Sequence, residues 1–184
     1  MLLPKEPESA ILCLAAKQKR DYSVVSLVIP TPYHCNQMHN AITDFLRTSH
    51  TCLLLVHPAV SRLEDAANEL LSVYDWPRLS VGRELSPVLL SETPQRRSRA
   101  VRQWMKTQLR AISPGPVLCT NIDLLFEPTL KLDPLRLMRD VSRVTRLVVA
   151  WPGSYVNDVL AYAVPDHSHY RTWRKPEVFI KVLE

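Results

Sequence analysis

Three polar residues that could do chemistry, Thr120, Asn121 and Asp123, directly follow a short apolar run at residues 117–119. A run of this length is typical of a strand that is buried on both faces, as in a parallel sheet. Ligands of open α/β sheets bind just outside the carboxyl ends of the strands, so these side chains stand at a functional position. An acid that ends such a strand is typical of proteins that hold Mg²⁺ beside a nucleotide. Here Thr120 takes the place of that acid, and the first carboxylate is Asp123.

Glycine is scarce in this chain, with only Gly82, Gly115 and Gly153 among its 184 residues. A loop that closes its backbone amides around a phosphate needs glycine at the points of closest approach. Asp123 could still hold a metal or activate a water molecule. Without a phosphate loop, however, the sequence favours a structural role for Asp123, as a helix cap or a turn residue.

Histidine and cysteine gather at two places that could suggest a metal site: His34, Cys35 and His39 form one group, and His167 and His169 form the other. Structural zinc takes four ligands at defined spacings, and neither group supplies them alone. We therefore expect ordinary surface or turn histidines and no metal. The four cysteines form no C-x-x-C pair, which indicates buried, reduced thiols.

A basic stripe lies along the helix that periodicity predicts over residues 95–112. A solvated face is the usual meaning of such a stripe, and binding of phosphates or of an acidic partner is the next interpretation. Residues 167–175 also mix basic and aromatic side chains, as single-strand binders do, but the segment is short. The basic stripe consists of Arg96, Arg97, Arg99, Arg102, Lys106 and Arg110.

Length and composition indicate one globular domain with a substantial core. Hydrophobic residues make up 46% and charged residues 22%, as is ordinary for soluble proteins. No apolar run approaches the roughly 18 residues of a membrane span, and the first residues do not read as a secretory signal. We therefore expect a cytoplasmic protein. A net charge of +5 permits contact with nucleic acid or an acidic partner without requiring it.

Strand and helix patterns alternate along the chain with short connections, which predicts an α/β fold with a parallel sheet flanked by helices. The predicted strands cover residues 23–29, 51–56, 79–81, 117–119, 146–151 and 158–164, followed by an apolar run at 178–183. The predicted helices cover residues 8–20, 36–47, 62–74, 95–112 and 133–144, and residues 86–94 are a loop or short helix.

Local signals fix several element ends. Ser61-x-x-Glu64 is a capping box at the start of the helix predicted over 62–74, and Asp133 before Pro134 is the cap of a later helix. The strand at residues 146–151 should end at Pro152-Gly153. We expect residues 1–40 to form an extension of one helix and one strand, and residues 41–184 to form the α/β domain.

Several phrases between residues 44 and 171 resemble the small P-loop protein BrxF of type 3 BREX phage-defence systems. They are LSVGRELS at 79–86, PQRR at 94–97, NIDLLFEPTLKLDPLRLM at 121–138, VVAWPG at 148–153 and LAYAVPDHSHYR at 160–171. The run from 121 to 138 is long and specific. Residues 1–40 have no counterpart in this resemblance, which implies a P-loop NTPase-like fold for the remainder.

The resemblance also implies an ATPase, and this chain lacks the residues for it. The phosphate loop should read GxxxxGK[ST], with a lysine on the phosphates and a hydroxyl on Mg²⁺. A carboxylate at the hydroxyl position would repel triphosphate. In the phosphate loop, His57 and Arg62 replace the two glycines, with Pro58 and Ser61 between them, Leu63 replaces the lysine, and Glu64 replaces the hydroxyl. Elsewhere, Thr120 replaces the magnesium-binding acid, and Pro152 replaces a polar sensor residue.

These losses predict a non-catalytic P-loop-like subunit or adaptor of a BREX-type defence system, without a cofactor. Its expected partners are other subunits of the defence complex, with DNA and a second copy of the chain as further candidates, and no membrane. We expect Val60 and Arg62 to fill the emptied site, and Trp151 and Pro152 to offer apolar area at its rim. The alternative is a nucleotide-binding ATPase with an atypical phosphate loop, completed by a neighbouring subunit.

Overall fold

The computed structural model describes residues 32–184, with side chains from residue 37 onward, and these residues belong to one compact unit. The helix and strand predicted at 8–20 and 23–29 lie outside the described residues. Helix α1 (Pro32–Arg47) begins four residues before the predicted start and crosses the expected domain boundary at residue 40. Its Met38, Ile42 and Phe45 are buried against the sheet, so α1 is part of the core of this unit.

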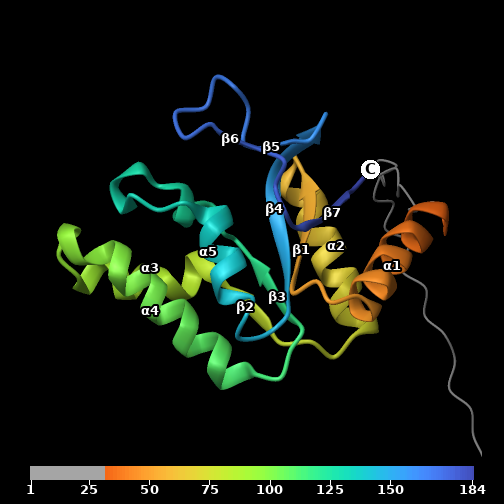
Figure 1. The fold of residues 1–184 in the computed structure, drawn as a ribbon, viewed down its shortest axis with the longest axis horizontal. Helices are drawn as coiled ribbons and strands as arrows, with labels where there is room; N and C mark the ends of the chain where they lie inside the picture. The colour runs from red at the N-terminus through yellow and green to blue at the C-terminus, as the bar shows by residue number, and fades with distance from the viewer. Residues whose placement is uncertain (1–31) are drawn as a thin grey trace, which may run out of the picture. The chain divides into compact units, whose positions relative to one another are not determined.

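Five parallel strands form the centre of the fold (Figure 1). The order across the sheet is β2-β3-β4-β1-β7, so β4 lies between β1 and β3. The mostly parallel α/β sheet that the sequence predicted is therefore confirmed. The strands are β1 (Cys52–His57), β2 (Arg78–Ser80), β3 (Val117–Thr120), β4 (Leu147–Val156) and β7 (Phe179–Val182).

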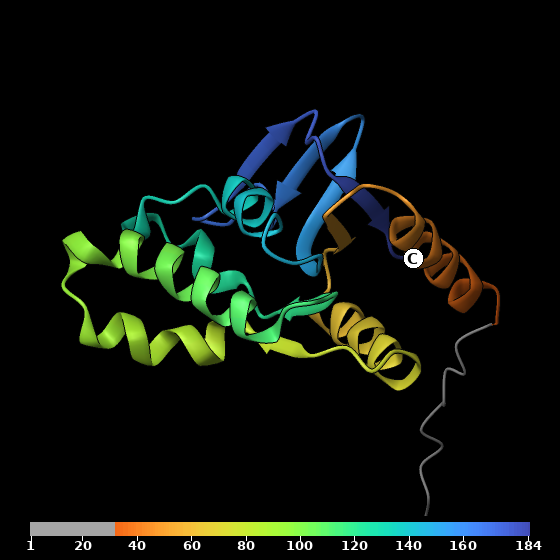
Figure 2. The same cartoon turned by 60° about the horizontal axis from the view of Figure 1, so that its bottom comes forward.

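Strand β4 does not end at Pro152-Gly153, as we had predicted, but continues to Val156. Beyond the parallel sheet it pairs antiparallel with β5 (Val159–Tyr162), which pairs with β6 (Arg171–Arg174). Pro152 and Gly153 do not end the strand, because Gly153 pairs with Tyr162 of β5 and this pairing continues to Val156. A small antiparallel extension therefore projects from the carboxyl end of the central strand (Figure 2).

Helices cover both faces of the sheet (Figure 1). Side chains alternate along each strand, so Leu53 and Leu55 of β1 point to one face, and Leu54 and Val56 point to the other. The first face packs against α1 and α2 (Val60–Val73), and the second against the remaining helices. These are α3 (Val81–Ser91), α4 (Pro94–Ile112) and α5 (Pro134–Val141), with the short 3₁₀ turns Asp123–Phe126 and Pro128–Leu130.

Two of the predicted helix starts were wrong. Helix α2 begins at Val60 with Ala59 as its N-cap and no side-chain cap, so Ser61 and Glu64 do not form a capping box. Helix α3 begins at Val81, which we had placed at the end of a strand, and it contains Pro87. The predicted cap of α5 is confirmed, because Asp133 Oδ1 accepts the backbone N–H of Arg136 at 3.0 Å.

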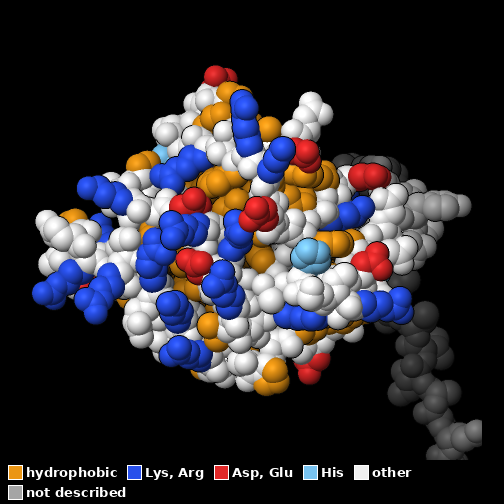
Figure 3. All heavy atoms as spheres, in the orientation of Figure 1, with side chains coloured by type: hydrophobic (Ala, Val, Ile, Leu, Met, Phe, Trp, Pro, Cys, Tyr) orange, Lys and Arg blue, Asp and Glu red, His pale blue; other side chains and the backbone are white. Residues whose placement is uncertain are grey.

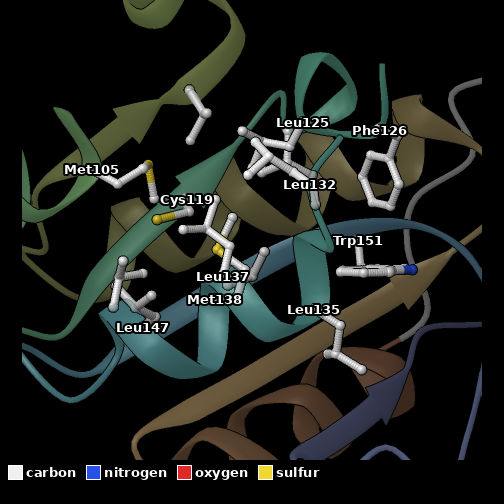
Figure 4. Close-up of a cluster of buried hydrophobic side chains, with 14 of the residues drawn as sticks. Met105, Cys119, Leu125, Phe126, Leu132, Leu135, Leu137, Met138, Leu147 and Trp151 are labelled. Atoms are coloured by element: carbon white, nitrogen blue, oxygen red, sulfur yellow. The ribbon is translucent and has the colours of Figure 1, made fainter. Parts of the chain in front are cut away.

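A cluster of aromatic side chains closes the core beneath the hairpin. Trp151 is fully buried, and its ring stands edge-on to Phe126, with the ring centres 5.1 Å apart (Figure 4). Trp173 of β6 is edge-on to Trp151 at 5.3 Å, and Tyr162 stacks on Phe126 at 3.5 Å. Such contacts add to the stability that burial of the rings already provides.

Candidate functional site

The three segments that the sequence marked as a nucleotide site meet at one edge of the sheet. Strands β1, β3 and β4 are parallel neighbours, so their carboxyl ends point to the same edge. His57 at the end of β1 lies beside Pro152 of β4, and Thr120 at the end of β3 lies beside Ser80 of β2. This edge is where ligands bind in open α/β sheets.

The connection after β1 is too short to cradle a phosphate. Strand β1 ends at His57 and α2 begins at Val60, so only Pro58 and Ala59 join them. The backbone N–H of Ala59 donates to His57 Nδ1 at 3.0 Å, which closes this turn on itself. A phosphate loop instead spans several residues that wrap their amides around the anion. Here the residues that would do so already belong to the first turn of α2.

The side chains of this first turn do not fill an emptied pocket, as we had expected. Val60 is 51% exposed, and Arg62 is exposed and donates to the backbone oxygen of Glu184 at 2.5 Å. Both side chains therefore lie at the surface. Leu63, at the position expected for the phosphate-binding lysine, is buried in the core with 4% of its surface exposed. No side chain of this turn is placed as a phosphate ligand.

An arginine that the sequence did not single out occupies the space between α2 and β3. Arg78, the first residue of β2, donates from Nε to Thr120 Oγ1 at 3.1 Å and forms an ion pair with Glu64 Oε2 at 2.5 Å. It also reaches Asn68 Oδ1 at 3.4 Å. Thr120 is buried, whereas Glu64 and Arg78 are about one-third exposed. One guanidinium thus ties three elements together.

This arrangement explains how the chain tolerates Glu64 at that place. By the resemblance, Glu64 stands at the magnesium hydroxyl and Thr120 at the magnesium-binding acid. The Arg78 guanidinium lies between them, bonds to both and balances the negative charge of Glu64. Guanidinium is always charged and offers several donors in a fixed geometry, which suits this three-way contact. No sequence signal marked Arg78, because its partners are 14 and 42 residues away.

Asn121 and Asp123 act as structural residues at the edge. Asn121 has a positive φ of 53°, and its carbonyl accepts the N–H of Gly82 at 2.7 Å, which docks the start of α3 on the end of β3. A Cβ at Gly82 would come within 2.8 Å of that carbonyl, so glycine is needed for this approach. Asp123 accepts from the Tyr162 hydroxyl at 3.3 Å. Burial, and then the negative charge of Asp123, raise the pKa of Tyr162 to about 12.

The expected apolar rim is absent from the described surface, because Trp151 and Pro152 are both buried. The Trp151 indole N–H donates to the carbonyl of Ala161 at 2.9 Å, so even its polar atom is satisfied internally. The β4–β5 hairpin covers the place where we had expected the strand to end. Polar residues form the accessible edge instead: Asn121, Asp123 and Ser154 are exposed.

The basic stripe lies on α4 and is mostly solvent-facing. Arg96, Arg99, Lys106 and Arg110 are exposed, and Arg102 is half-buried. Arg97 differs from the rest. Its Nε donates to the carbonyls of Leu89 at 3.1 Å and Glu92 at 3.3 Å, so it fixes the end of α3 against α4. These bonds leave Arg97 less free than the other basic residues of the stripe to bind a ligand.

Within residues 37–184, no three metal-ligating side chains lie close enough together to hold an ion. His39 contacts Glu69 at 3.5 Å and stacks on Tyr74, while His167 Nδ1 accepts the backbone N–H of His169 at 3.0 Å. His34 and Cys35 lie outside the described side chains. Cys52 and Cys119 are buried free thiols, and burial raises the pKa of Cys52 to about 12. Among the described helices, none is both long and apolar enough to span a membrane.

Comparison with known proteins identifies no relative: no family model, no curated protein and no solved structure matches this chain. A functional assignment therefore depends on the residues of the chain and on the geometry of the carboxyl edge.

Proposed function

We propose that this protein is a non-catalytic, P-loop NTPase-like subunit of a BREX-type phage-defence system, in which it acts by contacting other proteins. Support for the family comes from the sequence segments between residues 79 and 171 that resemble BrxF. Support for the P-loop-like architecture comes from the strand order, in which the strands of the degenerate loop, acid and sensor positions are neighbours. Their carboxyl ends lie at one edge, as a nucleotide site of this kind requires.

The observation that carries the non-catalytic part is the two-residue connection between β1 and α2. A phosphate cannot be enclosed by Pro58 and Ala59, because proline has no N–H and the following residues are already helical. Arg78 adds a second obstacle, since its guanidinium is bonded to Glu64 and Thr120 where a metal would have to bind. An ATPase with an atypical loop would have to displace both contacts.

We expect the protein not to bind ATP at this edge. Isothermal titration calorimetry with ATP and Mg²⁺ should give no heat beyond that of dilution. A micromolar dissociation constant that disappears when residues 57–64 are changed would overturn the non-catalytic proposal and favour the ATPase. ATP bound elsewhere, through its phosphates alone, would be unaffected by those changes and by removal of Mg²⁺.

The contact with a partner is expected at the exposed polar edge. The variant Asp123→Lys with Ser154→Glu reverses one charge and adds another there, and it should weaken co-purification with proteins encoded beside this chain. The fold should tolerate the variant, because the 3.3 Å hydrogen bond from Tyr162 to Asp123 contributes only about 1 kcal/mol to stability.

A matched control places the same changes at the opposite end of the sheet, as Asp75→Lys with Ser72→Glu. Both residues are exposed at the end of α2. We expect this control to co-purify as the parent does. If the edge variant keeps its partners and changes within residues 1–40 release them, the contact lies in that segment and not at the edge.

A further inference from the structure

A groove separates α5 from the chain that leaves β6. It has a volume of about 440 Å³ and lies on the second face of the sheet, and its lining includes none of the residues of the degenerate nucleotide site. Helix α5 forms one wall, and Arg174, Lys175 and Pro176 form the other. The half-buried ring of Trp173 contributes to its lining. We call this feature the α5–β6 groove.

Five exposed cations converge on this groove from the two walls. Arg136 and Arg139 lie one turn apart on α5, and Arg143 follows in the turn after the helix ends. The other two come from the end of β6 and the turn after it. They are Arg136, Arg139, Arg143, Arg174 and Lys175. Within the described chain, Arg139 forms an ion pair, with Glu177 at 2.8 Å, and the other four side chains form none.

The acidic residues of the groove do not cancel this charge. Asp133 and Asp140 are the two carboxylates in its lining. Asp133 already accepts the N–H of Arg136 at 3.0 Å and the indole N–H of Trp173 at 3.2 Å. It therefore serves as a helix cap and as an anchor for Trp173. The groove keeps an excess of positive charge even when Glu177 is counted beside Arg139.

The two walls are held in place before any ligand binds. Trp173 is bonded to Asp133 and stands edge-on to buried Trp151, so it is fixed from two sides. Lys175 has a positive φ of 46°, and its N–H donates to the carbonyl of Asp158 at 2.7 Å. Unusual backbone of this kind persists only where the surrounding structure supports it, and it is common at binding sites. The cations thus project from rigid backbone.

We propose that the α5–β6 groove binds the sugar–phosphate backbone of a nucleic acid. Three arginines follow one another from α5 into the turn after it, and two further cations line the other wall, which suits a row of phosphates better than a single small anion. Four of the five cations are arginine, whose planar fork matches phosphate oxygens in pairs. Figure 3 shows further basic side chains around this region, over α4 and α5.

An acidic protein fits the groove less well. Protein interfaces draw most of their affinity from buried apolar anchors. Leu135, an aliphatic residue of the lining, is only 4% exposed, and Trp173 is half-buried. The groove therefore offers charge with little apolar area, which is the pattern of backbone-directed nucleic-acid binding. This proposal does not depend on the absence of ATPase activity.

The test is fluorescence anisotropy with a fluorescein-labelled oligonucleotide of mixed sequence, as single strand and as duplex, at several salt concentrations. The groove variant carries Arg136→Gln, Arg143→Gln and Lys175→Gln. We expect it to raise the dissociation constant at low salt by about tenfold or more. The slope of log K against log salt should fall in magnitude by about 2 to 3, because each phosphate contact contributes about 0.7 to 0.9 to that slope.

The matched control is Arg99→Gln, Arg102→Gln and Lys106→Gln on α4, which removes the same charge from side chains that do not line the groove. We expect this control to lose clearly less affinity than the groove variant, since none of its three side chains lines the groove. All changed side chains lie at least partly in solvent, so circular dichroism melts should match the parent.

Two results would overturn the proposal. In the first, the groove variant binds the oligonucleotide as tightly as the parent, or no more weakly than the α4 control. In the second, labelled polyglutamate binds the parent through these residues and the oligonucleotide does not, which would make the occupant an acidic protein.

Discussion

Replacing Trp151 by alanine is expected to lower the free energy of unfolding by about 3–5 kcal/mol. Trp151 is 0% exposed, and its ring contacts Phe126 and Trp173 edge-on at 5.1 and 5.3 Å. Its indole N–H donates to the carbonyl of Ala161 at 2.9 Å. The substitution would open a large cavity between the sheet and the hairpin and remove this hydrogen bond. Urea denaturation followed by circular dichroism measures the decrease.

Two further variants make the Trp151 prediction specific. Trp151→Phe keeps much of the packing and removes the indole donor, so we expect an intermediate decrease in stability. Trp104→Ala removes a half-buried tryptophan from α4 and should cost about 1–2 kcal/mol. If Trp151→Ala lowered the free energy of unfolding no more than Trp104→Ala does, the Trp151 side chain would have to lie at an accessible rim, as the sequence predicted.

Replacing Gly153 by alanine should destabilise the protein by about 3 kcal/mol or more, although it adds one methyl group. A Cβ at this position would overlap the carbonyl oxygen of Ala161 and come within 2.8 Å of its carbon and 3.1 Å of Tyr162 Cα. These are backbone atoms of the paired strand β5, so they cannot rotate away as a side chain would. Accommodation would require β4 and β5 to separate.

The neighbouring residue provides the control for Gly153. Ser154→Ala changes an exposed side chain on the same strand and should alter the free energy of unfolding by about 0.5 kcal/mol or less. Thermal melts of the two variants are sufficient for the comparison. Equal melting temperatures would mean that the hairpin is not paired as described, and that the site is less covered than the structure indicates.

The stability predictions for Trp151 and Gly153 bear on function because the β4–β5 hairpin covers the place where we had expected β4 to end. A partner that contacts the carboxyl edge meets polar residues such as Asn121, Asp123 and Ser154, not an apolar pocket. Variants of Trp151 or Gly153 would reduce partner binding through unfolding, whereas changes at Asp123 and Ser154 act on the surface itself. The two kinds of variant therefore distinguish an unfolded protein from a folded protein with an altered binding surface.

Much of the fold could be predicted from the sequence, because it depends on interactions between residues close along the chain. Periodicity identified α2 and α4, and Asp133 before Pro134 identified α5 and its cap. Alternation of helices and strands predicted the parallel sheet. The sequence alone also determines which residues stand at the degenerate positions.

Only the tertiary structure decided what those positions do. Whether β4 stops at Pro152 depends on β5, because a strand continues wherever another backbone pairs with it. Trp151 is buried for the same reason, since the hairpin and Trp173 cover it. Arg78 meets Glu64 and Thr120 only because β2 and β3 are neighbours and α2 lies over them. Local sequence patterns do not reveal such partners, because the order of the strands in the sheet brings together residues that are far apart in the sequence.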